Sequence, residues 1–124
     1  MQKYMPGLSK KSFSLPFHGG EIWCEHLDSL YDERALLIDK FQQDLIAISK
    51  PSTSSFIAIN LEETNVDRAL IDFIADTLSS LNKRIQKVVF VGLNSEMKRY
   101  VNKLKINFLV TCLDDFEKAK EWLV

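Results

Sequence analysis

The chain has 124 residues, of which 46% are hydrophobic and 27% are charged, with 16 basic against 17 acidic side chains. This length suits one domain with one hydrophobic core, and the apolar content is too high for a disordered protein. A net charge of −1 argues against a basic nucleic-acid interface or a polybasic membrane anchor. The N-terminus leads into no apolar signal core, and the longest apolar runs are far too short for a membrane span. The composition therefore predicts a cytoplasmic protein.

The first residues carry little pattern. Pro6-Gly7 is typical of a loose segment, so we predict a flexible N-terminal arm over residues 1–11 and a single domain over residues 12–124. The two cysteines, Cys24 and Cys112, lie far apart and lack the spacing of metal ligands. We interpret them as free thiols of a reducing compartment.

Two alternating runs, Ser12–Phe17 and Glu21–Leu27, flank the turn sequence His18-Gly19-Gly20. Alternation of this kind on both sides of a glycine turn predicts an antiparallel β-hairpin. In the second run the two faces of the strand carry different side chains, Ile22, Cys24 and His26 on one and Trp23 and Glu25 on the other.

Helical and strand periods alternate along the rest of the chain. Apolar residues at helical spacing predict a helix over Ser29–Lys50, with Ser29 and Asp32 as a capping box. Strands are then predicted at Phe56–Leu61, Val88–Val91 and Asn107–Leu113, each followed by a helix. The crossovers are long enough for parallel pairing and should be right-handed. The sequence thus predicts an α/β fold, a single-layer mixed or mainly parallel sheet with an N-terminal hairpin and about four helices.

The sequence offers little catalytic chemistry. Only His18 and His26 could act as histidine bases, and neither lies near a nucleophile motif. A glycine-rich phosphate loop is excluded because the glycines are dispersed along the chain, at Gly7, Gly19, Gly20 and Gly92. We therefore predict a protein that is not an enzyme and that uses no cofactor and no metal.

The densest polar feature is the segment Glu62–Arg68, at a predicted junction of strand and helix. The simplest interpretation is helix capping, in which Thr64 or Asn65 accepts the free amide hydrogens and Asp67 complements the positive helix end. The functional interpretation is a recognition site, where exposed amides and Arg68 hold an anion or a charged group of a partner.

A second polar junction, Asn94-Ser95, opens the next predicted helix, with Ser95 as the expected cap. If the strands are parallel, both junctions lie at the same edge of the sheet. The candidate partner- or ligand-binding residues are therefore Glu62, Glu63, Thr64, Asn65, Asp67, Arg68, Asn94 and Ser95.

The strand Phe56–Leu61, the following helix and the segment Lys87–Met97, together with the closing segment Asp114–Leu123, resemble the STAS domain of sulfate transporters and anti-sigma-factor antagonists. The resemblance covers about Ser55–Val124. It implies a STAS-like fold and a regulatory module without enzymatic activity. It also implies binding of a protein partner, of unknown identity, through the helix that opens near Asp67 and its neighbouring loops.

The chain departs from the family at its hallmark, an Asp-Ser-Ser or Asp-Ser-Thr followed by Gly at this helix start. Asp67 takes the place of the aspartate, but Arg68 and Ala69 occupy the hydroxyl positions and Leu70 that of the glycine. The resemblance therefore implies a divergent member that is not switched by phosphorylation at the usual place.

Two alternatives stay open. One is a small-ligand-binding domain or enzyme with a pocket at the carboxyl ends of the strands, where open α/β sheets place their ligands, lined by Asn60, Glu62, Thr64, Asn65, Asn94 and Ser95. The other is a homodimer formed through the N-terminal hairpin, because this hairpin has more apolar residues than an edge needs, namely Phe13, Leu15, Phe17 and Trp23.

Overall fold

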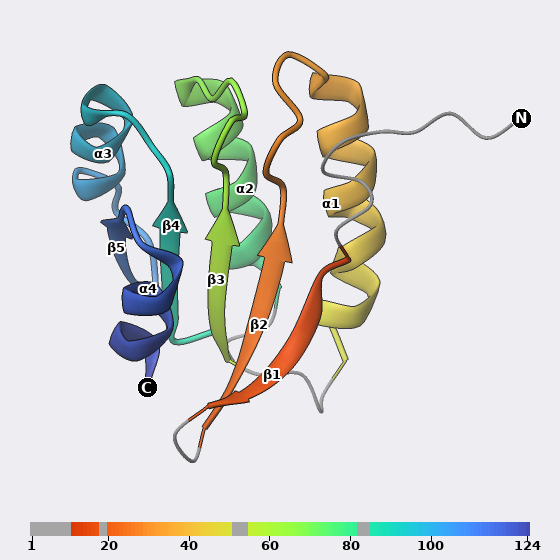
Figure 1. Ribbon diagram of the computed structural model, residues 1–124, viewed down its shortest axis with the longest axis vertical. Helices are drawn as coiled ribbons and strands as arrows, with labels where there is room; N and C mark the ends of the chain where they lie inside the picture. The colour runs from red at the N-terminus through yellow and green to blue at the C-terminus, as the bar shows by residue number, and fades with distance from the viewer. Residues whose placement is uncertain (1–10, 18–19, 51–54, 82–84) are drawn as a thin grey trace, which may run out of the picture.

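The computed structural model of the protein describes residues 11–17, 20–50, 55–81 and 85–124 (Figure 1). Almost all of the predicted arm over residues 1–11 and the His18-Gly19 part of the hairpin turn lie outside the described residues.

The strands form one five-stranded sheet whose spatial order is the same as their order in the chain. They are β1 (Phe13–Phe17), β2 (Gly20–His26), β3 (Phe56–Asn60), β4 (Lys87–Val91) and β5 (Leu109–Leu113). The first pair is antiparallel, with Phe13 opposite Cys24, and every later pair is parallel. The predicted α/β fold class, a mixed sheet led by a hairpin, is confirmed.

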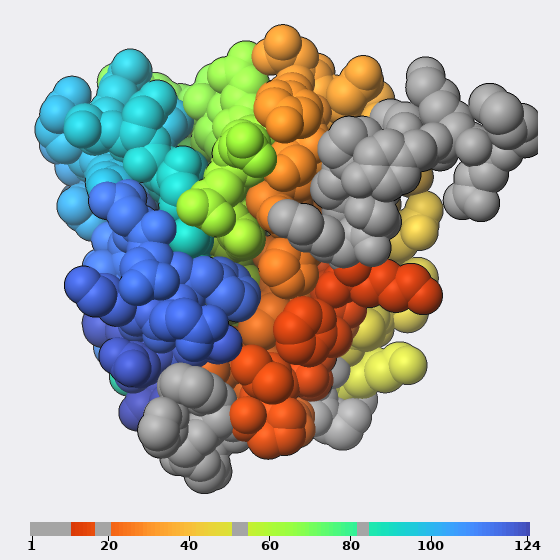
Figure 2. Space-filling view, viewed as in Figure 1, coloured from red at the N-terminus to blue at the C-terminus, as the bar shows by residue number. Residues whose placement is uncertain are grey.

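In the part of the chain that the structure describes, four helices cover the sheet, three of them on one face and the last on the other (Figure 1). They are α1 (Arg34–Ile48), α2 (Arg68–Ser80), α3 (Ser95–Asn102) and α4 (Phe116–Leu123). Because each parallel connection steps in the same direction along the sheet, right-handed crossovers place α1, α2 and α3 on one side. Figure 2 shows the opposite face, where α4 lies beside β1.

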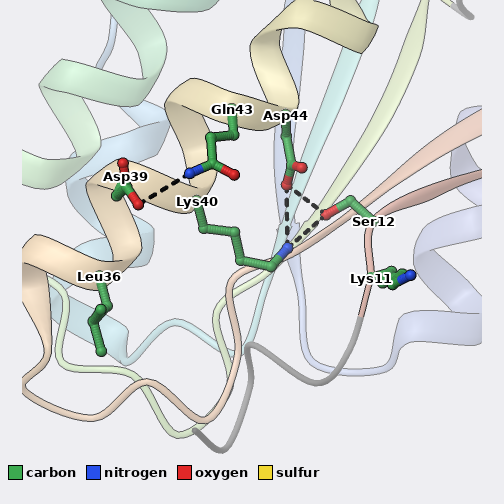
Figure 3. A pocket seen from close by; sticks show the side chains of 7 residues that line it. All are labelled: Lys11, Ser12, Leu36, Asp39, Lys40, Gln43 and Asp44. Carbon is green, nitrogen blue, oxygen red and sulfur yellow. Dashed lines mark hydrogen bonds and ion pairs between the residues drawn. The ribbon is translucent and has the colours of Figure 1, made fainter. Parts of the chain in front are cut away.

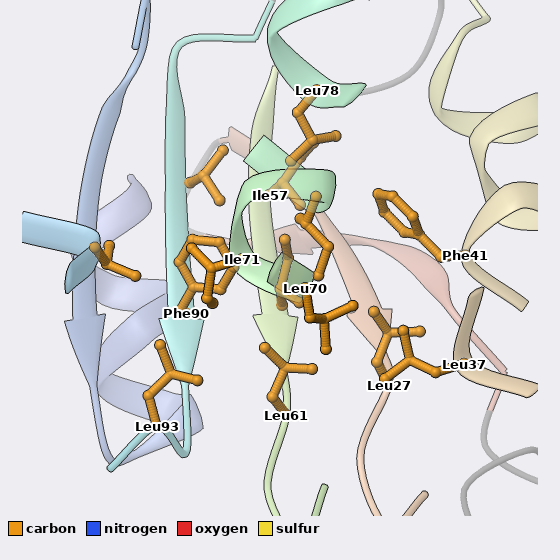
Figure 4. Close-up of a cluster of buried hydrophobic side chains, with 14 of the residues drawn as sticks. Leu27, Leu37, Phe41, Ile57, Leu61, Leu70, Ile71, Leu78, Phe90 and Leu93 are labelled. Carbon is orange, nitrogen blue, oxygen red and sulfur yellow. The ribbon is translucent and has the colours of Figure 1, made fainter. Parts of the chain in front are cut away.

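The two faces of the sheet carry separate hydrophobic clusters. The larger one joins the strands to the three crossover helices and contains fully buried Phe41, Ile57 and Phe90 (Figure 4). The smaller one lies under α4, where Ala119 and Leu123 pack with strand residues Ile22, Cys24, Ala58, Val89 and Val91. Central strands buried on both faces require apolar residues in succession, as the sequence of β3 and β4 has.

The predicted helix Ser29–Lys50 is shorter in the structure, because α1 begins at Arg34. Ser29 and Tyr31 have positive φ angles of 59° and 49°, and Tyr31 forms a parallel bridge with Thr64. The prediction of a capping box at Ser29 is therefore wrong. Its segment continues the pairing beyond β2 and does not start the helix.

Smaller differences occur near the C-terminus. The last strand begins at Leu109 and not at Asn107. The cap of α4 is Asp115, which accepts from the Glu117 amide. Among the described residues, no helix has both the length and the apolar character that a membrane span needs.

We expect helix α4 to be essential for stability, because it is the helix that covers the second face. Leu123 is fully buried, so Leu123→Ala should lower the free energy of unfolding by about 2–5 kcal/mol. Urea unfolding measures this change. Glu121→Ala, at an exposed position of the same helix, is the control and should stay within about 0.5 kcal/mol of the wild type. Equal midpoints for the two variants would show that α4 contributes little.

Candidate functional site

The candidate binding residues gather at one edge of the sheet. Strands β2 to β5 are parallel, so the loops that follow them meet at their carboxyl ends, at the top of Figure 1. The predicted placement of the two polar junctions at the same edge follows from this arrangement.

Backbone hydrogen bonds join the loop after β2 to the loop after β3. The Ser29 amide donates to the Glu62 carbonyl over 2.7 Å, and the Tyr31 amide donates to the Glu63 carbonyl over 3.0 Å. Thr64 adds side-chain bonds, since its hydroxyl donates to the Leu27 carbonyl over 2.7 Å and accepts from the Leu30 amide. These bonds extend the parallel pairing past the strands and fix the shape of both loops.

The cap of α2 is Asp67, and the expected caps Thr64 and Asn65 have other partners. The Asp67 carboxylate accepts from the Leu70 amide over 2.9 Å and from the Arg34 guanidinium over 3.2 Å. The Leu70 amide is the main cause that holds the pKa of Asp67 below its ordinary value, and the Arg34 charge adds to it.

Asn65 joins the same network through both of its ends. Its side-chain amide donates to Asp32 over 2.9 Å, and its carbonyl accepts from Arg34 over 3.0 Å. Glu63, which has a positive φ of 55°, accepts from the Ser29 hydroxyl over 3.1 Å. The loop after β3 is thus held by side chains on the α1 side as well as by its backbone.

The start of α3 is capped by Asn94, whose side chain accepts from the Met97 amide over 2.8 Å. Ser95, the expected cap, is the first helical residue and is exposed. The sequence placed the cap one residue too late because serine and asparagine are equally good caps.

Arg68 lies across the exposed side of α2 and α3. Its guanidinium carbon is 5.1 Å from the centre of the Tyr100 ring and one of its nitrogens is 3.9 Å from Glu96. The Tyr100 hydroxyl donates to Asp72 over 2.6 Å, and this bond, together with the Asp72 charge, raises the pKa of Tyr100. Because 63% of the Arg68 side chain stays exposed, its charge is available to a partner.

The edge is acidic, although the chain as a whole is nearly neutral. We name it the acidic edge, and its exposed acids are Asp32, Glu33, Glu62, Glu63, Asp67, Glu96, Asp114 and Asp115. The cations Arg34, Arg68 and Lys98 each lie beside one of these acids, Lys98 at 2.7 Å from Asp114.

A small cavity of about 160 Å³ lies between the starts of α2 and α3. It brings together three candidate residues, Thr64, Asn65 and Asn94, along with Val66, Gly92, Leu93 and Met97. Ligand pockets usually measure about 300–1,000 Å³, so this cavity is small for a metabolite. The strand order also lacks the reversal at which open α/β sheets form a binding crevice.

Of the two histidines considered for catalysis, His18 lies outside the described residues and His26 has structural partners. His26 Nδ1 lies 3.1 Å from buried Asp28, and its ring stacks on Phe13 and contacts the tilted ring of Phe116. Burial raises the pKa of both Cys24 and Cys112 to about 11, so these free thiols stay protonated at neutral pH and are weak nucleophiles. Within the described residues, no group of three or more histidine, cysteine or acidic side chains is arranged to hold a metal ion.

Arg34, Tyr100 and the close approach of Gly92 were not predicted from the sequence. Helical spacing placed Arg34 and Tyr100 among apolar positions, and only the three-dimensional contacts show that their polar ends reach Asp67 and Asp72.

Comparison of the chain with protein-family models, with curated proteins and with solved structures finds no match.

Gly92 determines how closely the loops after β3 and β4 approach each other. Its φ is +89°, and a Cβ at this position would lie 2.5 Å from Cγ and 2.8 Å from Cα of Glu62. Both the backbone conformation and the space therefore require glycine.

Gly92→Ala should accordingly lower the free energy of unfolding by more than about 1 kcal/mol, because it combines an unfavourable φ with a steric clash. Thermal unfolding measures the loss. Ser95→Ala, an exposed substitution three residues away, should leave the midpoint nearly unchanged. A Gly92→Ala protein as stable as the wild type would mean that the two loops are not in contact.

Proposed function

We propose that this protein is a non-enzymatic, STAS-like interaction module that binds a protein partner through the acidic edge. The observation that carries the proposal is the acidic edge itself, an exposed surface of charged side chains held by backbone pairing, two helix caps and Arg34. A surface that is already ordered loses little conformational entropy on binding, which favours recognition of another protein.

The α/β architecture supports the proposal, because it belongs to the fold class that the STAS resemblance implies. The hallmark position of that family falls on Asp67, which caps α2, and the next residues are Arg68 and Ala69. Without a hydroxyl in this first turn, the interaction is constitutive and not controlled by phosphorylation at the usual place.

Charge indicates the chemistry of the partner. Acids dominate the acidic edge, and Arg68 is a largely exposed cation among them. Complementarity therefore favours a partner surface that is mainly basic and carries one acid opposite Arg68.

The homodimer through the N-terminal hairpin stays a prediction. Trp23 is buried in the core and adds nothing to such an interface, whereas Phe13 is 42% exposed.

Charge reversal at Arg68 tests the interaction. The wild-type chain, immobilised in an extract of the source cell, should capture a partner, and Arg68→Glu should weaken its binding by about thirtyfold or more, as for an interface hot spot. Lys50→Glu is the matched control, because it makes the same charge change on an exposed residue at the opposite edge of the sheet. Equal affinity of wild type and Arg68→Glu would remove this edge from the proposal.

The second candidate function is binding of a small ligand in the cavity beside Thr64 and Asn94. Asn60, once expected to line it, is buried and accepts from the Glu62 amide over 3.0 Å. The small volume makes this the weaker candidate.

A thermal-shift screen of metabolites separates the two functions. A ligand at 100-fold excess over its dissociation constant would add about 2.7 kcal/mol of stability. For an interaction module we expect no metabolite to raise the midpoint. A reproducible rise that disappears in Asn94→Ala, but persists in Lys50→Glu, would favour the ligand-binding function instead.

A further inference from the structure

A buried acid that is not part of the acidic edge lies in β2. Glu25 is fully buried on the sheet face that α1 covers. Its Oε1 accepts from the Trp23 indole nitrogen over 2.8 Å, while its Oε2 has no hydrogen-bond donor among the described residues. An ionised carboxylate left in this state would be costly, because burial removes the water that stabilises its charge.

A polar cluster from α1 and from the residue before β1 is bound to this part of β2, and Figure 3 shows its members Ser12, Lys40 and Asp44. On α1, the Lys40 ammonium lies 3.1 Å from Asp44 Oδ2. Just before β1, the Ser12 hydroxyl donates to the same oxygen over 2.8 Å and accepts from Lys40 over 2.9 Å. Ser12 also accepts from the backbone amide of His26 over 2.9 Å, so this hydroxyl ties the start of β1 to both β2 and α1.

The charges in this cluster balance only when one carboxyl group is neutral. Within the described residues, the charged groups that face Glu25 are Asp44 and Lys40 of α1, and two carboxylates would share this single ammonium. Burial, followed by the hydrogen bond and charge of Asp44, raises the pKa of Glu25 well above its ordinary value of 4.5. Burial opposes ionisation of Asp44 too, but hydrogen bonds from Glu25, Ser12 and Lys40 outweigh it and lower the pKa of Asp44.

We propose that Glu25 and Asp44 share a single proton in the folded protein, and that this proton holds the start of β1 against α1. Protonation turns the unpartnered Oε2 of Glu25 from an acceptor into a donor. Phe13 lies opposite Cys24 in the sheet, which brings the preceding Ser12, and the Asp44 carboxylate that it holds, next to Glu25, so Asp44 is the acceptor within reach. Asp44 in turn orients Ser12 and Lys40. Loss of the proton places two negative carboxylates in contact, pushes Asp44 away and releases Ser12.

The released proton reaches water through a cavity of about 350 Å³ beside α1. Asp44, Lys40 and Ser12 line this cavity, together with Lys11, Leu36, Asp39 and Gln43 (Figure 3). Of the residues that line the cavity, Lys11 and Asp39 are exposed to solvent and carry opposite charges, so their charges cancel. The edge strand β1 is therefore a pH-sensitive element, closed near pH 4.5 and loosened as the pH rises above it.

The sign of the pH dependence follows from linkage. In the closed form, in which β1 is held against α1, Glu25 keeps its proton. In the open form, in which β1 is released, Glu25 has its ordinary pKa and loses the proton. Glu25 contributes its full share of the stability below its ordinary pKa of 4.5, and this share is lost as the pH rises toward the folded-state pKa of Glu25. The lowered pKa of Asp44 acts in the opposite sense, but only below its ordinary value of 3.8, so the pH dependence above 4.5 comes from Glu25. Over this range the equilibrium constant for opening should rise about tenfold per pH unit, because one proton is released for each opening.

Two measurements on the full chain test the proposal. The side-chain carboxyl ¹³C shift of Glu25, followed by NMR, should titrate above the ordinary range of glutamate. Amide hydrogen exchange in β1, divided by the intrinsic exchange rate, should show the slope of about tenfold per pH unit. Titration of Glu25 near pH 4.5 in the folded protein would overturn the proposal, and this measurement requires no variant.

Glu25→Gln separates the proton from the packing. Glutamine keeps the shape, accepts from Trp23 and donates permanently to Asp44, so β1 should stay closed and its exchange slope should vanish. Glu121→Gln, an exposed change on α4, should retain the wild-type slope. A folded Glu25→Gln protein that still shows the slope would also overturn the proposal, because another group would then control the opening.

Discussion

The structure depends on the burial of its two central strands on both faces. Ile57 and Phe90 face the crossover helices, while Ala58 and Val89 face α4, and all are sealed from water. Because the strands follow chain order, right-handed connections bring every crossover helix to the same side. The second face can then be covered only by an element that does not connect strands, and α4 has this role. Small Ala58 and Ala119 allow it to pack closely.

This arrangement explains why the candidate site lies in loops. The helices use their apolar faces for the core, so varied polar side chains gather where strands end and helices begin. The hydrogen bonds that cap the helix starts also fix the shape of the acidic edge. Asp67 shows this, because its carboxylate caps α2 and binds Arg34 from the start of α1. A partner that docks here therefore meets a surface whose shape the fold has already set.

The local spacing of apolar residues was sufficient to predict the fold class. It did not predict the role of residues whose partners are distant in sequence. Alternation correctly placed Glu25 with Trp23 on one face of β2, but only Asp44 on α1 explains how an acid is accommodated there. Ser29 has the residue type and spacing of a helix cap. Its segment instead pairs with the loop after β3, more than thirty positions away, and this pairing is invisible to helical periodicity. Thr64 was misjudged for the same reason.

The agreement between chain order and strand order has a consequence for synthesis on the ribosome. Each new strand finds its neighbour already made, so the sheet can grow by one strand at a time as the chain emerges. Until α4 emerges, however, Ile22, Ala58 and Val91 stay open to water on a finished sheet. The nascent chain thus passes through a stage with one unprotected apolar face, when contact with a chaperone would be most useful.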